Sequence, residues 1–277
     1  MRGGCVSVGT FAKRDAYGRQ SLLGEAAGLR WLAEAEAQGG LHAARVERVS
    51  ETELVEERIS CTRATRDAAE RIGVALAHTH AAGAPWWGCP PAGWQGAYRL
   101  EHSRTLTTSA QEAPASWGAF YARFRIMPAV RVLCDGGLFG AQERALFERV
   151  CAKLEAGAYD APQPELVGAQ GHAVARLHGD LWAGNLLWDA NPQNHTGGAF
   201  IDPMAHGGHA ETDLAMLALF GCSFLDTILA SYDELSPLAD GWRERVGLHQ
   251  LSPLLLHCVL FGGHYVGETL RVARGYA

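Results

Sequence analysis

Three oxygen-bearing side chains stand close together in a polar segment of the second half of the chain. Asn185 follows Asp180 by five residues, and Asp202 comes after a pair of predicted short strands at residues 186–189 and 199–201. A turn rich in Asn, Pro and Gly joins those two strands into a hairpin. Because the open ends of a hairpin lie side by side, the sequence predicts that Asp180, Asn185 and Asp202 lie within a few ångströms of one another.

These residue types suit phosphoryl transfer. A carboxylate at Asp180 can orient an attacking hydroxyl and accept its proton, while the amide oxygen of Asn185 and the carboxylate of Asp202 are ligands that Mg²⁺ prefers. The spacing H-x-D-L-x-x-x-N, which begins at His178, is typical of a kinase catalytic loop. We expect His178 and Asp213 to be structural supports: His178 through hydrogen bonds within the loop, and Asp213 by capping the next helix and bracing the loop.

Four further residues near this segment are weaker candidates for substrate contact. Trp182 either packs within the protein or stacks on a sugar ring of the substrate. His206 and His209 lack a third soft ligand nearby, so substrate contact is a better interpretation than a zinc site. Glu211 is either a solvated carboxylate at a helix start or a group that attracts a protonated amine.

A second group of candidates lies near the beginning of the chain. Only two of the 24 basic residues are lysine, and one of them, Lys13, ends a predicted strand over residues 6–14. The helical period of residues 21–38 places Leu22, Ala26, Leu29 and Leu32 on one face with Glu25 beside it. Two more short strands are predicted at residues 43–49 and 53–59.

The rest of the chain is predicted to be mainly helical. Helices are expected at residues 65–81, 116–133, 141–156, 213–230 and 249–274, with an irregular stretch at 83–96. The 277 residues carry a net charge of -6, so the charge does not indicate a nucleic-acid-binding protein. No apolar segment reaches the length of a membrane span. Seven dispersed cysteines indicate reduced thiols in a cytoplasmic protein.

Several motifs closely resemble the fructosamine kinase (ketosamine 3-kinase) family of the protein-kinase-like and aminoglycoside-phosphotransferase-like superfamily. The motifs are HGDLWAGNLLWD, IDPMAHGGHAETDLAMLALFG and HQLSPLLLHCVLFGGHYV, with ALAHTHAAG, SWGAFYARFRIMPAV, FAKR and GEAAGLRWL upstream. The resemblance implies an α+β, bilobal protein-kinase-like fold. Residues 1–58 would form a small, shortened, β-rich nucleotide-binding lobe, and residues 59–277 a larger helical lobe for catalysis and substrate binding.

The resemblance also implies roles for the nucleotide-lobe residues and for the cofactors. Lys13 would contact the ATP phosphates, and Glu25 would orient it. The segment 54–59 would be the lobe-connecting hinge, in which the backbone of Glu57, Arg58 and Ile59 would hold adenine. Asp180 would be the catalytic base, and the two metal candidates of the hairpin would bind Mg²⁺.

The activity implied by the resemblance is ATP-dependent phosphorylation of the 3-hydroxyl of a ketosamine. Such a substrate is a small molecule or a protein-bound sugar adduct of an amine, and its phosphorylated product releases the free amine, which is a deglycation reaction. The protein would act as a monomer without nucleic acid or membrane partners. Two alternatives stay open: a related kinase for aminoglycosides or amino alcohols, and a weak pseudokinase, suggested by the few residues before Lys13.

Overall fold

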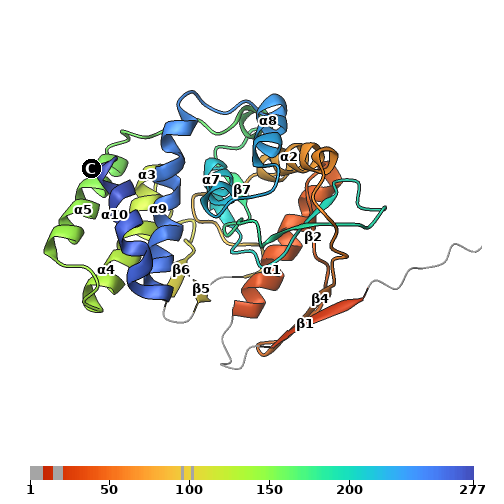
Figure 1. Ribbon diagram of the computed structural model, residues 1–277, viewed down its shortest axis with the longest axis horizontal. Helices are drawn as coiled ribbons and strands as arrows, with labels where there is room; N and C mark the ends of the chain where they lie inside the picture. The colour runs from red at the N-terminus through yellow and green to blue at the C-terminus, as the bar shows by residue number, and fades with distance from the viewer. Residues whose placement is uncertain (1–8, 15–20, 95–96, 101–102) are drawn as a thin grey trace, which may run out of the picture.

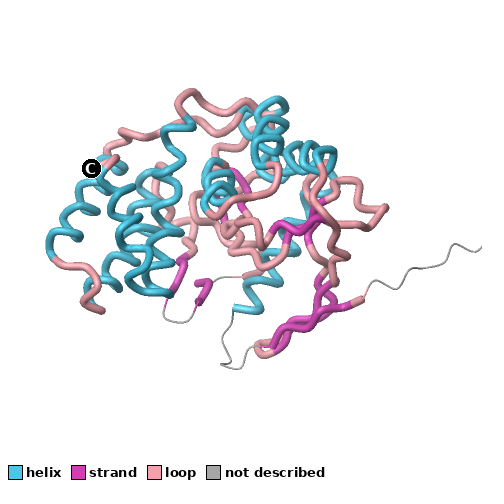
Figure 2. The backbone as a smooth tube through the Cα atoms, in the orientation of Figure 1, coloured by secondary structure: helices cyan, strands magenta, loops and turns pink. Residues whose placement is uncertain are grey.

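The computed structural model describes residues 9–14, 21–94, 97–100 and 103–277. A small strand-rich part near the N-terminus lies against a larger helical part (Figure 1). The tube in Figure 2 shows that helices dominate the larger part and that its strands are short and lie among loops. The predicted α+β, two-part kinase-like architecture is confirmed, while the boundary after residue 58 stays a prediction.

The small part is a three-stranded antiparallel sheet with one helix beside it. Its sheet order is β1-β4-β3, and Lys13 of β1 pairs with Leu54 of β4. The predicted face of the first helix is buried: Leu22 and Ala26 pack with Leu54 against the sheet. The elements are β1 (Thr10–Arg14), α1 (Ser21–Ala33), η1 (Glu34–Gln38), β2 (His42–Ala43), β3 (Val46–Val49) and β4 (Glu53–Glu57).

Two boundaries in the small part differ from the prediction. The helix predicted to residue 38 tightens into the 3₁₀ turn η1 and ends at Gly39, whose φ of 91° suits glycine. The strand predicted over residues 43–49 is divided. Its first residue, Ala43, belongs with His42 to β2, which pairs in parallel with β9 of the larger part, and Ala44 N–H donates to the Phe200 carbonyl. Residues 6–8 of the first predicted strand lie outside the described residues.

The larger part buries two main apolar clusters. One is centred on α2 and α8, where Gly73 permits close approach because a Cβ there would lie 2.3 Å from the Ile228 carbonyl oxygen. The other joins the helices from α3 to α5 with α9 and α10 around Phe120 and Phe147. The helices are α2 (Arg66–Ala81), α3 (Trp117–Tyr121), the π-helical η2 (Ala122–Ile126), α4 (Met127–Asp135), α5 (Ala141–Glu155), α6 (Glu165–Ala169), α7 (Glu211–Leu219), α8 (Leu225–Leu235), α9 (Trp242–Phe261), η3 (Gly262–Tyr265) and α10 (Val266–Arg274).

The strands of the larger part form short pairs. The hairpin β8–β9 corresponds to the predicted strands at 186–189 and 199–201, and β7 pairs with β10 just before the α7 helix. These two strand pairs bring polar residues of the segment between β7 and α7 close together. The strands are β5 (Ala97–Leu100), β6 (Ser103–Leu106), β7 (Ala175–Leu177), β8 (Leu186–Trp188), β9 (Gly198–Phe200) and β10 (His206–Gly208).

The predicted helices are present, with two breaks that the periodicity does not show. The helix predicted at 213–230 is two helices, because the chain turns between α7 and α8 and Phe224 has a φ of 56°. The helix predicted at 249–274 begins earlier, at Trp242, and breaks at Gly262, whose φ is 72°. No helix or strand occurs in the described residues 83–94, as predicted.

One helical stretch, Trp242–Arg274, is long and apolar enough to cross a membrane by length and composition. In this fold, α9 packs against α4, α7 and α10. Its residues Leu248, Leu251 and Leu255 are buried in the cluster around Phe120. The apolar character of α9 is therefore accounted for in good part by core packing.

Candidate active site

The loop after β7 holds Asp180 in a tight turn that requires glycine before it. Gly179 has a φ of 83°, and a Cβ at this position would lie 2.2 Å from the Met204 carbonyl oxygen. His178 is buried, and its Nε2–H donates to the Ile201 carbonyl at 2.9 Å while Nδ1 accepts from the Asp180 N–H at 3.2 Å. This ring thereby connects the turn to the end of β9.

Asp213, at the start of helix α7, also stabilises the turn at Gly179. Its two carboxylate oxygens accept the backbone N–H groups of His178, at 2.7 Å, and Gly179, at 3.0 Å. His80 of α2 lies 3.3 Å from the same carboxylate and 2.8 Å from the Tyr232 hydroxyl. Burial acts to raise the pKa of Asp213, but His80 and the backbone donors outweigh it and lower that pKa. The turn is thus anchored to α2, α7 and α8.

Asp180 and Asn185 are in direct contact. The Asn185 amide nitrogen donates to the Asp180 carboxylate at 3.1 Å and to the Asp180 carbonyl at 2.9 Å. Burial raises the pKa of Asp180 to about 6; the carboxylates of Asp202 and Asp213 add to this, and the Asn185 hydrogen bond opposes it. A carboxylate with this pKa is ionised at neutral pH and is a better proton acceptor than an exposed one.

Asp202 follows β9 in the left-handed region, with a φ of 53° that is uncommon outside glycine. A non-glycine residue in this region carries backbone strain, and the Asp202 side chain is 44% exposed. The Asp202 carboxylate forms an ion pair with Lys13, and Ile201 N–H donates to the Asn185 carbonyl at 3.1 Å. The hairpin therefore brings Asp202 beside the Asp180–Asn185 pair and connects it to the small part.

Lys13 is surrounded by three carboxylates. Its Nζ lies 2.5 Å from Glu25 of α1 and 3.0 Å from Glu56 of β4, in addition to Asp202. Burial would lower the pKa of Lys13, but the three carboxylates raise it above its usual range. Burial also raises the pKa of Glu25 to about 8, although Lys13 opposes that shift.

Glu56 is a residue whose role the sequence did not reveal. Its side chain is 2% exposed, and its Oε2 is buried without a hydrogen-bond partner among the described residues. Burial raises its pKa. The sequence does contain one indication that Glu56 is buried. Glu56 lies two residues after the buried Leu54 on the same strand, and side chains two residues apart on a strand lie on the same face.

The donor set at the end of the hairpin fits a magnesium ion. The Asn185 amide nitrogen faces Asp180, so its amide oxygen is the group left for a cation, and the Asp202 carboxylate is partly exposed beside it. Both are hard oxygen donors. Lys13 supplies the positive charge next to Asp202 in this structure.

The three hinge candidates differ in what their backbones offer. Glu57 N–H donates to the Arg45 carbonyl, and Arg58 N–H donates to the Gly9 carbonyl, so both amides are used within the small part. Ile59 is buried in the α2–α8 cluster, and its N–H has no partner among the described residues. Ile59 is therefore the one of the three whose amide is available to a base.

A narrow cavity of about 50 Å³ adjoins Asp180. Its inner wall is made by buried aromatic residues such as Trp117 and Phe120, and Met216 of α7 and Leu256 of α9 also line it. His206 lines this cavity too, but it is 4% exposed and its Nδ1 donates to the Met204 carbonyl at 2.8 Å. Burial lowers the pKa of His206 to about 3, so the ring is neutral.

The remaining substrate candidates lie in two different environments. Trp182 is 41% exposed and follows Asp180 by two residues. Glu211 is 3% exposed, so its carboxylate is not a solvated one, and it binds Arg245 at 2.5 Å and His249 at 3.2 Å. His209 is also buried, with Nε2 3.3 Å from the Ala161 carbonyl. Within the described residues, His209, Glu211 and His249 could together hold a metal, but protein partners already bind Glu211.

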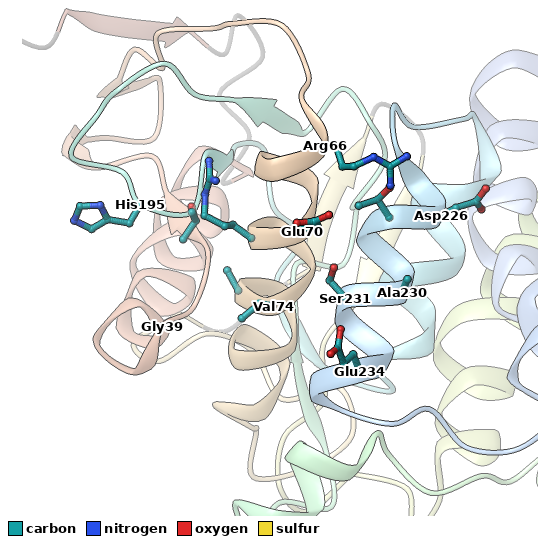
Figure 3. Close-up of a pocket in the computed structure, with 13 residues that line it drawn as sticks. Gly39, Arg66, Glu70, Val74, His195, Asp226, Ala230, Ser231 and Glu234 are labelled. Atoms are coloured by element: carbon teal, nitrogen blue, oxygen red, sulfur yellow. The ribbon is translucent and has the colours of Figure 1, made fainter.

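A much wider cavity of about 910 Å³ lies apart from these residues, between α2 and α8 (Figure 3). Glu70 and Val74 of α2 and Ser231 and Glu234 of α8 line it. None of the predicted site residues lines it. Size alone does not identify the chemical site, because the contacts among Asp180, Asn185, Asp202 and Lys13 lie outside this cavity.

The chain matches the fructosamine kinase family over residues 11–274. A probable ketoamine kinase of Synechocystis is 30% identical over 99% of this chain and 88% of its own length. One from Enterococcus faecium is 27% identical over 72% of this chain, and the match spans 63% of that relative, which is less than two thirds.

Solved structures agree with this result. The "putative fructosamine-3-kinase" of Thermobifida fusca superimposes with a TM-score of 0.81 and 37% identity, over 96% of this chain and 85% of that one. An ADP-bound aminoglycoside phosphotransferase has a TM-score of 0.57 at 13% identity, over 96% of this chain and 88% of that one, and so shows the fold alone. Fold and site define a kinase-like phosphotransferase class. Within it, the chain belongs to the fructosamine kinase family.

Proposed function

We propose that this protein transfers the γ-phosphoryl group of ATP to the 3-hydroxyl of a ketosamine. The observation that carries the proposal is the pairing of Asp180, which lines the narrow cavity, with Asn185, together with the ion pair of Lys13 and Asp202 at the end of the same hairpin. The names of the relatives, ketoamine kinases and a fructosamine-3-kinase, support the substrate class.

In this mechanism, Asp180 orients the substrate hydroxyl and accepts its proton. The Asn185 hydrogen bond and the turn braced by His178 and Asp213 fix the direction of that carboxylate. Lys13, held by Glu25, binds the phosphates, and the amide of Ile59 together with the carbonyl of Glu57 holds adenine. Catalysis in this class depends on positioning and on charge stabilisation, which are the functions these residues supply.

Asn185 and Asp202 would hold Mg²⁺, which would supply positive charge to balance that of the phosphates. Of the four candidates for substrate contact, we retain Trp182 as the residue that contacts the sugar, because its ring is exposed beside Asp180. We assign His206, His209 and Glu211 to the structure of the segment from β10 to the first turn of α7, since all three are buried and have protein partners. The hydrogen-bonded positions of His178 and Asp213 support a bracing role.

We further propose a deglycation role in the cytoplasm, with the protein acting as a monomer. The described cysteines are all free, which suits a reducing compartment. The phosphorylated ketosamine would release its free amine, and a net charge of -6 gives no support for nucleic acid binding.

The test is a substrate panel. Purified protein with ATP and Mg²⁺ is offered ketosamines derived from fructose, ribulose and erythrulose, and aminoglycosides and choline in parallel, with ADP release measured. We expect turnover of at least one ketosamine and none of the other amines. Turnover confined to aminoglycosides or choline would contradict the substrate assignment, and nucleotide binding without any turnover would indicate a pseudokinase.

The matched control in this panel is Asp180→Asn, which keeps the size of the side chain. We expect kcat to fall by about 10²- to 10⁴-fold, the usual loss of a general base, while ATP still raises the melting temperature. Activity within a factor of a few of the unchanged protein would contradict the role of Asp180.

A further inference from the structure

An exposed row of aromatic rings leads away from the catalytic turn. Trp182 lies edge-on to Phe220 with centroids 6.4 Å apart, and Phe220 lies 4.8 Å from His257. The row continues to Phe261, 5.3 Å from His257, and to Tyr265, 5.0 Å from it. We call Phe220, His257, Phe261 and Tyr265 the aromatic row.

Two members of the aromatic row, Phe220 and Phe261, are exposed, and the other two, His257 and Tyr265, are half-buried. Phe220 is 41% exposed and Phe261 is 58% exposed, the highest value among the large apolar side chains of the described residues. Exposed rings that touch one another in a line mark a contact surface more often than scattered single residues do. Core packing does not explain Phe261, since more than half of it faces water.

The aromatic row is continuous with the narrow cavity at Asp180. Met216 of α7 lines the cavity, and Phe220 follows it by one helical turn. On α9, Pro253 lines the cavity, and His257 and Phe261 follow at successive turns. Because the inner wall of the cavity is closed by buried aromatic residues, a substrate bound there extends outward, toward the aromatic row.

The chemistry of a ketosamine determines what would lie on this surface, and this step rests on the proposed function. The amine nitrogen is three bonds from the carbon that carries the 3-hydroxyl, so the substituent on nitrogen begins close to Asp180. If that substituent is a lysine side chain, its main chain lies about 6 Å further out. Neighbouring residues of the same polypeptide, about 3.4 Å apart when extended, would then pass over Phe261 and Tyr265.

We propose that the aromatic row is a docking surface for the polypeptide that carries a glycated lysine, and that it favours apolar residues beside that lysine. Flat rings with few rotatable bonds provide contact area at low entropic cost, which suits recognition of variable peptide sequences. A small free ketosamine would end close to Asp180 without reaching Phe261.

The test uses three substrates and four proteins. The substrates are a glycated lysine blocked at both ends, a glycated-lysine peptide flanked by leucine, and the same peptide flanked by serine. The proteins are the unchanged chain, Phe261→Ser, Phe261→Tyr, and Leu138→Ser as the control. Leu138 is 38% exposed and lies in the segment between α4 and α5, outside the elements that carry the aromatic row.

We expect the unchanged protein to have the lowest KM for the leucine-flanked peptide. Phe261→Ser should raise that KM by about threefold to tenfold, leave kcat unchanged, and not alter the KM for blocked glycated lysine. Phe261→Tyr should restore the low KM, and Leu138→Ser should change none of these values.

Three results would overturn the proposal. The first is an equal KM for both peptides in the unchanged protein, and the second is an equal effect of Phe261→Ser on all three substrates. The third is unchanged peptide kinetics in Phe261→Ser with weaker sedimentation on phosphatidylcholine–phosphatidylglycerol vesicles, which would make the aromatic row a membrane contact. Failure of the proposed function would look different, because no ketosamine, free or in a peptide, would then be phosphorylated.

Discussion

Asp180 is partly buried, yet in the proposed mechanism its carboxyl group must be ionised in order to accept a proton. Burial raises its pKa to about 6, with contributions from two nearby carboxylates, so it is protonated below that pH and cannot accept a proton. We expect kcat/KM to fall about tenfold per pH unit below pH 6, because this constant reports the ionisation of the free enzyme. A pH–rate profile with saturating Mg²⁺ checks this, and a flat profile down to pH 5 would contradict it.

Glu56 is the residue at which burial and charge conflict most clearly. One of its oxygens contacts Lys13 at 3.0 Å, and the other is buried without a partner among the described residues. A buried polar atom without a hydrogen bond costs about 1–3 kcal/mol. Lys13 also keeps Glu25 and Asp202 as partners if Glu56 is replaced.

We therefore expect Glu56→Met, which keeps the volume, to raise the free energy of unfolding by about 1 kcal/mol or leave it unchanged. Urea denaturation of the nucleotide-free protein measures this, with Glu25→Met as the comparison. A loss of more than 2 kcal/mol for Glu56→Met would show that its contact with Lys13 outweighs the burial of its second oxygen.

At the scale of elements, His42 connects three segments of the small part. Its Nε2 lies 2.9 Å from Glu57 of β4, and its Nδ1 lies 3.4 Å from Glu36 of η1. Burial acts to lower the pKa of His42, but the hydrogen bonds to Glu36 and Glu57 outweigh it and raise the pKa to about 9. A raised histidine pKa gives stability that is complete below the unfolded pKa of about 6.5 and is lost as the pH rises through 9.

His42→Gln should therefore lower the free energy of unfolding by about 1–3 kcal/mol at pH 6 and by much less at pH 10. Chemical denaturation at the two pH values measures the difference. An equal loss at both would mean that the imidazole contributes packing and not charge.

The elements also show what the sequence could and could not predict. The hairpin β8–β9, helix α2 and the buried face of α1 follow from local periodicity and turn residues, and the structure contains them. The parallel pairing of β2 with β9 involves two residues of each strand, far apart in the chain, and no local pattern encodes it. The break before Phe224 and the burial of Glu56 likewise depend on tertiary neighbours.

At the scale of the whole molecule, Lys13 and Asp202 join the two parts across the site. One residue comes from the small sheet and the other from the end of the hairpin, and the β2–β9 pairing joins the same two parts nearby. A nucleotide held by both parts would stabilise the fold by mass action, about 2.7 kcal/mol at a hundredfold excess over Kd. The share of this stabilisation that requires Mg²⁺ depends on Asp202 and Asn185.

We expect ATP with Mg²⁺ to raise the melting temperature more than ATP with EDTA does, and Asp202→Ala to abolish that difference. Asn185→Ala should reduce it less, because a neutral ligand contributes less to binding the cation than a carboxylate. Without nucleotide, Asp202→Ala should cost under about 1 kcal/mol, since the Lys13–Asp202 pair is partly exposed. The measurement is a Mg²⁺ titration by thermal shift at fixed ATP, with Asp226→Ala as the control because Asp226 lies in the cavity between α2 and α8. If Asp202→Ala and the unchanged protein gave the same titration curve, Asp202 would not be a ligand, and its pair with Lys13 would serve only to hold the two parts together.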